Sequence, residues 1–113
     1  MKGIIWYAPG HKDLALKELE YIKEKYQTLK INIISERKSI NTASITFDNE
    51  DYWEISSVNE SSRGKCCNIS YVDRAIDIEK FDCIISPVTK GFPYTAFHLY
   101  GGGNLFIMSY ERR

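Results

Sequence analysis

The sequence predicts an α/β fold, with one mixed sheet, a β-hairpin and flanking helices in a single compact domain at residues 1–113. Apolar residues recur at helical spacing over residues 11–27, and two apolar runs around the polar residues 48–51 predict the hairpin. A further apolar strand at residues 68–73 ends on an acid. Strands that alternate with helices around one hairpin are typical of an α/β domain.

The first third of the chain predicts two strands around the longest helix. GIIWYA at residues 3–8 is rich in strand-forming residues, and Pro9-Gly10 ends it. The helix at residues 11–27 follows, and LKINII at residues 29–34 predicts the next strand. Residues 36–39 are polar and predict a link. The apolar positions of the helix are Ala15, Leu16, Leu19, Ile22 and Tyr26.

The hairpin comprises predicted strands at residues 44–48 and 52–58. A polar loop at residues 59–65 then leads to the strand at 68–73. A short amphipathic helix is expected to begin near Asp77 and to stop at Pro87, since the residue before a proline disfavours helix.

Three further segments complete the chain. Residues 89–100 are rich in aromatic side chains and predict a loop. Gly101–Gly103 predicts a flexible hairpin, and residues 104–110 predict a final strand.

Composition excludes several classes of protein. Fifteen basic residues balance fifteen acidic ones, so net charge gives no reason to expect nucleic acid as a partner. No apolar run approaches the length of a membrane span, and the first apolar stretch is too short for a signal peptide. We therefore expect a cytoplasmic protein without a membrane partner.

The cysteines and histidines form no recognisable chemical motif. Cys66 and Cys67 are adjacent and Cys83 is separate, which fits neither a disulfide framework nor a zinc site. Cys67 and Cys83 are expected to be small buried residues. His11 and His98 are far apart in the sequence and belong to no ligand motif. We therefore expect no catalysis, metal or cofactor.

The order of these segments resembles a known ATPase core. GIIWYA, the helix at residues 11–27, ITFDNEDYWEI, SSRGK and NISYVD follow one another as comparable segments do in phage large-terminase motors and related helicases. The resemblance covers about two thirds of the chain, by order and spacing rather than by a strict signature. It implies a P-loop-NTPase-like fold, with Asp73 in the place of the Walker B acid.

Departures from that family bear directly on function. The phosphate loop requires a G-x-x-x-x-G-K-[ST] pattern, whose amides and lysine hold phosphates and whose hydroxyl holds Mg²⁺. The segment 10–13 after the first strand has neither that spacing nor the hydroxyl. Arg74 stands where the motors have a catalytic glutamate. The resemblance therefore implies a degenerate fold that is not an enzyme.

Five residues form the first candidate site. Arg63, Gly64 and Lys65 suit a phosphate or the acidic face of a partner, although a solvated turn explains them slightly better. Asp73 with Arg74 suits either a residual ligand site or a strand-end ion pair. The charged end of the loop is expected to lie near Asp73 and Arg74.

Four aromatic residues form a second candidate surface. Arginines are not interleaved with them, which makes base stacking a poor explanation. Core packing or a protein interface explains them better, because Tyr and Phe are favoured in interface cores. The four residues are Phe92, Tyr94, Phe97 and Tyr100.

Three functions follow as hypotheses. The first is a non-catalytic phage-type accessory protein that binds a protein partner, such as an inhibitor of a host or defence-system component. The alternative is a truncated or split piece of a DNA-packaging ATPase that binds nucleotide or nucleic acid. The third is a small nucleic-acid-binding module whose basic residues are Arg37, Lys38, Arg63, Lys65 and Arg74.

Overall fold

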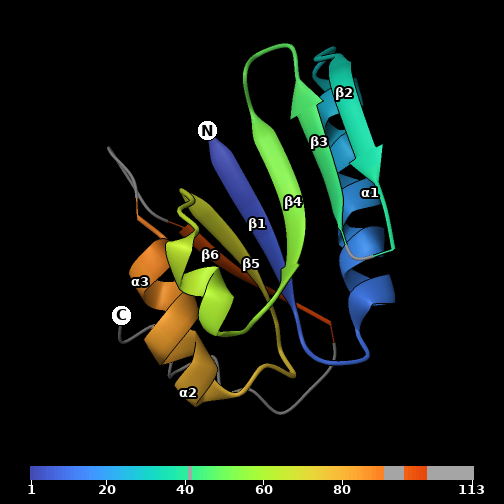
Figure 1. Cartoon of the computed structure of the whole chain (residues 1–113). Coiled ribbons are helices and arrows are strands. Elements are labelled where there is room, and N and C mark those ends of the chain that lie inside the picture. The colour runs from blue at the N-terminus through green and yellow to red at the C-terminus, as the bar shows by residue number, and fades with distance from the viewer. Residues whose placement is uncertain (41, 91–95, 102–113) are drawn as a thin grey trace.

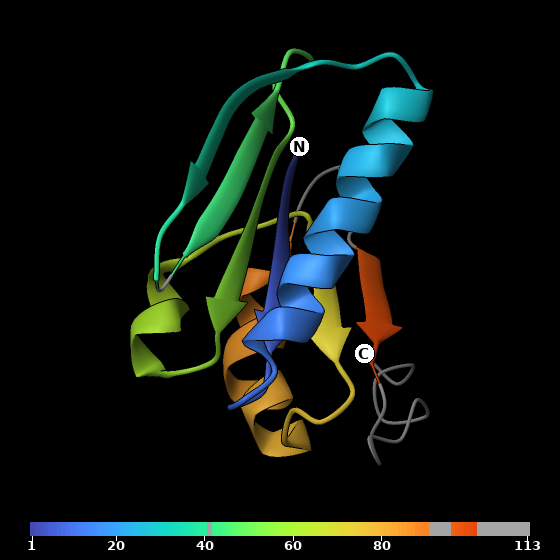
Figure 2. The same cartoon turned by 90° about the vertical axis from the view of Figure 1, so that its right-hand side faces the viewer.

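In the part of the chain that the structure describes, six strands form one mixed sheet in the order β2-β3-β4-β1-β5-β6, and helices cover both of its faces (Figures 1 and 2). The computed structural model describes residues 1–40, 42–90 and 96–101. The strands are β1 (Lys2–Tyr7), β2 (Ile33–Lys38), β3 (Ala43–Phe47), β4 (Tyr52–Ser57), β5 (Ile69–Asp73) and β6 (Ala96–Tyr100). The described residues therefore confirm a single compact α/β domain.

Strand directions divide the sheet into two parts. β1 is parallel to both of its neighbours, β4 and β5, and β5 is parallel to β6. β3 is antiparallel to β2 and to β4, as the hairpin prediction requires. The carboxyl ends of β4, β1, β5 and β6 consequently lie along one edge of the sheet.

The helix α1 (Lys12–Thr28) packs on one face and confirms the strongest prediction from sequence. Its buried residues Ala15, Leu19 and Ile22 form one core with Ile5 and Trp53 of the sheet. Successive residues of a strand point to opposite faces. The other residues of β1 therefore serve a second core.

That second core lies on the opposite face, where Ile4 and Trp6 meet Phe81 and Ile85. Three consecutive helical segments supply it: α2 (Ile78–Lys80), the π-helical η2 (Phe81–Ile85) and α3 (Ser86–Val88). A 3₁₀-helix, η1 (Glu60–Gly64), occupies the loop between β4 and β5. No helix of the described residues is long and apolar enough to cross a membrane.

The predicted strand at residues 29–34 is wrong in position. The chain leaves α1 through Lys30, whose φ of 61° is left-handed, and β2 begins only at Ile33. The polar residues 36–38, predicted as a link, therefore belong to a strand. An edge strand packs few side chains and tolerates charges that discourage edge-to-edge association, which explains its polar sequence.

The predictions for the last third also need correction. Residues 96–100 form β6 rather than a loop, because they pair in parallel with β5, a distant partner that local sequence does not reveal. The helical run continues through Pro87, which lies in the first turn of α3, where its missing N–H is tolerated. Gly102, Gly103 and the predicted strand at 104–110 lie outside the described residues.

Candidate binding crevice

β1 and β5 are adjacent parallel strands whose connections leave for opposite faces of the sheet. β1 leads to α1 on one face, and β5 leads to α2 on the other (Figure 1). Open α/β sheets bind ligands at such a switch point, outside the carboxyl ends of the strands. A ligand site is therefore expected at this edge.

Asp73, the last residue of β5, holds the loops at this edge together. Its side chain is fully buried, and its Oδ2 accepts the Ala8 N–H at 3.0 Å and lies 2.8 Å from His11 Nδ1. Its Oδ1 accepts the Ala75 N–H at 2.9 Å. Because an ionised carboxylate only accepts hydrogen bonds, His11 donates from Nδ1. Asp73 thus joins the β1–α1 connection to the β5–α2 connection.

The end of β6 is fixed to the same edge. The Tyr100 hydroxyl donates to the Trp6 carbonyl at 2.7 Å, and burial raises the pKa of Tyr100. Gly101 has a φ of +76°, and an added Cβ would lie 3.3 Å from Asp73 Oδ1. The chain beyond β6 therefore passes close to the buried carboxylate at a position that suits glycine.

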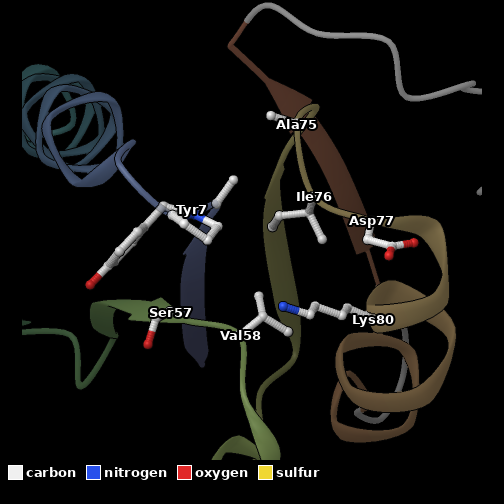
Figure 3. A pocket seen from close by; sticks show the side chains of 9 residues that line it. Tyr7, Ser57, Val58, Ala75, Ile76, Asp77 and Lys80 are labelled. Carbon is white, nitrogen blue, oxygen red and sulfur yellow. The ribbon is translucent and has the colours of Figure 1, made fainter.

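A pocket of about 320 Å³ lies beside this network, at the ends of β1, β4 and β5 (Figure 3). Most of the residues around it are apolar. We call this pocket the crevice, and its lining residues are Tyr7, Ala8, Pro9, Ser57, Val58, Ala75, Ile76, Asp77 and Lys80.

Two opposite charges line the crevice but face different ways. Figure 3 shows the Lys80 ammonium pointing from α2 towards Val58, while the Asp77 carboxylate points away from it. Asp77 Oδ1 accepts the Glu79 N–H at 2.9 Å and caps the helical run. Among the described residues no carboxylate lies within ion-pair distance of Lys80. The crevice therefore has one ammonium available to a ligand.

A second hollow of about 490 Å³ continues the crevice towards η1. The two share Val58, Asp77 and Lys80, and we call them together the groove. The second hollow adds Asn59, Glu60, Arg63, Glu79, Cys83 and Ile84. Cys83 is exposed, which corrects the prediction that it is buried, whereas Cys67 is 2% exposed as expected.

The predicted loop residues separate in the structure. Arg63 lines the groove and pairs with Glu60 at 2.7 Å. Lys65 pairs instead with Glu54, in the middle of β4, at 3.3 Å. Gly64 is the last residue of η1. Neither ion pair involves Asp73, and Arg63 instead lines the second hollow together with Glu79 and Lys80 of α2.

Asp73 and Arg74 also have different surroundings from those predicted. The Asp73 carboxylate contacts the His11 imidazole and forms no ion pair with Arg74 among the described residues. Arg74 donates its N–H to the Tyr100 carbonyl, and its Nε is buried without a hydrogen-bond partner within the part of the chain that is described. Because Asp73 is inaccessible, its role here is to position loops.

The aromatic candidates divide in a similar way. Tyr100 is 7% exposed and belongs to the core, and Phe97 packs against Phe81 with ring centroids 5.3 Å apart. Core packing, one of the two explanations left open, is therefore correct for Tyr100. Phe92 and Tyr94 lie outside the described residues.

Sequence reasoning missed His11 and the lining residues of the crevice, above all Val58, Ile76 and Lys80. One available signal was that His11 closely follows one strand and Asp73 ends another, because parallel neighbouring strands bring their carboxyl ends together. The described residues contain no group of three or more His, Cys, Asp or Glu able to hold a metal ion. Comparisons with family models, curated proteins and solved structures found no match to this chain.

Proposed function

We propose that this protein acts by binding a protein partner in the groove and has no chemistry of its own. One observation supports this most: the two hollows share Val58, Asp77 and Lys80 and so make one elongated surface. An extended segment of a partner fits such a surface better than a compact metabolite does.

The composition of the groove suits a protein interface. Apolar side chains of Val58, Ile76 and Ile84 lie within it, and the charged residues Glu60 and Arg63 lie at its η1 end. Protein interfaces combine an apolar centre with a polar rim, and loops held by a rigid sheet commonly carry binding residues. The expected partner is a host or phage protein, such as a component of a defence system.

Affinity capture from host-cell lysate tests this proposal when groove variants are compared. Val58→Arg places a large charged side chain in both hollows, so a specific partner is captured by the wild type and lost with this variant. Lys25→Glu, on the last turn of α1 and exposed, serves as the control and retains the partner. A partner that binds Val58→Arg as well as the wild type contradicts the proposal, provided that both proteins melt at similar temperatures.

Single charge reversals give a second test. Arg63→Glu alters an exposed groove residue, so it weakens partner binding with little effect on stability. Lys65→Glu instead places a second carboxylate beside the poorly exposed Glu54, which destabilises the fold by about 1 kcal/mol without a direct effect on the groove. Equal loss of binding in both variants, at equal stability, contradicts this assignment.

The second candidate function is nucleotide binding by a degenerate P-loop-like domain, the split DNA-packaging piece suggested by sequence. The position of the crevice at a switch point favours it, because nucleotides bind there in doubly wound folds. The engagement of both Asp73 oxygens by protein donors counts against it.

A further inference from the structure

We infer that the crevice binds the C-terminal carboxylate of a partner chain whose last residue is apolar. This inference rests on the proposed function, because it names the element of the partner that enters the groove. One charge, an apolar wall and the direction of the groove support it.

Lys80 supplies the charge. It is the one Lys or Arg among the lining residues of the crevice, its ammonium points towards Val58, and no described carboxylate pairs with it. The nearby acid, Asp77, is directed at the Glu79 N–H. A single carboxylate therefore matches the crevice better than a phosphate dianion, which would also meet the negative field of Asp77.

The apolar wall supplies the second requirement. Ala8, Val58 and Ile76 line the crevice, and Figure 3 shows Val58 and Ile76 projecting into one space. A volume of about 320 Å³ is at the small end of the range for ligand pockets, so it suits one side chain rather than a cofactor. The C-terminal residue of a polypeptide can supply both groups, because it carries a free carboxylate and its own side chain.

The direction of the groove indicates a chain end. A segment that enters from η1 passes Val58 and Lys80, which belong to both hollows. On the far side it meets Ala8 and Pro9 of the β1–α1 connection, and Asp73 fixes the Ala8 N–H there. We therefore place the last residue of the segment in the crevice, against these residues.

Two small probes test the recognition of the carboxylate. N-acetyl-leucine and N-acetyl-leucinamide have the same side chain and differ in charge, and their binding is followed by amide chemical shifts of the full chain. Lys80→Gln removes the ammonium of the crevice. Lys25→Gln is the control, because it removes another exposed ammonium, which lies in the last turn of α1 and does not line the groove. Melting temperatures confirm that each variant is folded.

We expect the acid to bind about fivefold more tightly than the amide, the ratio that corresponds to a solvent-accessible ion pair. Lys80→Gln abolishes this preference, Lys25→Gln retains it, and the shifted amides lie around Val58, Ile76 and Lys80. Equal binding of acid and amide by the wild type overturns the inference, and so does a preference that survives Lys80→Gln.

A longer acetylated peptide that ends in leucine identifies the source of the carboxylate. If the ligand is a chain end, the peptide acid binds more tightly than N-acetyl-leucine, and Arg63→Glu or Val58→Arg removes that gain. No gain overturns the chain-end inference in favour of a free apolar acid. One combination of results separates the two proposals. If Val58→Arg loses the captured partner but the wild type binds N-acetyl-leucine and N-acetyl-leucinamide equally, the proposed function stands and this inference alone is refuted.

Discussion

At the scale of single residues, Asp73 has the largest structural influence, because it is fully buried and accepts hydrogen bonds from three donors in two connections, β1–α1 and β5–α2. Asp73→Asn replaces one acceptor oxygen by an NH₂ group. If Oδ1 is replaced, the Ala75 N–H loses its acceptor, and if Oδ2 is replaced, the Ala8 N–H and His11 Nδ1 lose theirs. We expect the free energy of unfolding in urea to fall by about 2–3 kcal/mol. Asp48→Asn, on the exposed hairpin turn, is the control and changes it by less than about 0.5 kcal/mol.

Tyr26 provides a prediction about pH at the same scale. Its hydroxyl donates to Asp51 at 2.6 Å and accepts from the Trp53 indole at 3.1 Å, and burial, followed by Asp51, raises its pKa to about 12. A raised pKa in the folded state stabilises the protein below the ordinary value of 10.0, and this contribution disappears as pH rises towards 12. Urea unfolding between about pH 8 and 12 should therefore show a steeper loss of stability for the wild type than for Tyr26→Phe. Parallel pH profiles for the two proteins would contradict this expectation.

At the scale of elements, the packing of β1 against β4 requires glycine at position 3. An added Cβ at Gly3 would overlap the six-membered ring of Trp53, which is 3% exposed and has little room to move. We expect Gly3→Ala to lower the free energy of unfolding by about 1–3 kcal/mol, as overpacked cores generally do. Gly64→Ala is the matched control, because an added Cβ there meets nothing within 4 Å. Similar stabilities of the two variants would mean that the Trp53 ring repacks freely.

At the scale of the whole molecule, the β1–α1 connection stands where P-loop domains carry their phosphate loop, between a strand and a helix, and it spans only residues 8–11. The connection from β1 to α1 is short, and its Ala8 N–H is already bonded to Asp73. We expect no change in melting temperature with ATP and Mg²⁺. A ligand present at a hundred times its dissociation constant would raise the free energy of unfolding by about 2.7 kcal/mol, and a thermal melt detects such a change easily. A clear rise would favour nucleotide binding over the proposed function.

Sequence predicted those parts of the molecule whose signals are local. The helical spacing of Ala15, Leu19 and Ile22 identified α1, and the polar turn identified the β3–β4 hairpin. β6 was missed because it is an edge strand that pairs in parallel with β5, which is distant in sequence, and no hairpin turn joins the two strands. The contact between His11 and Asp73 joins residues 62 positions apart. The crevice was missed for the same reason, since its lining comes from three connections that only the sheet brings together.

The central position of β1 has a consequence for how the chain folds. β2, β3 and β4 are joined by short turns and pair with near neighbours, so they form a meander at little entropic cost. β1 must instead insert between β4 and β5, and its bond from Lys2 to Asn68 closes a separation of 66 residues. Because folding slows as native contacts become less local, we expect the meander to form first and the insertion of β1 to limit the folding rate. The crevice, which depends on β1 lying against both neighbours, is then completed only in the last stage of folding.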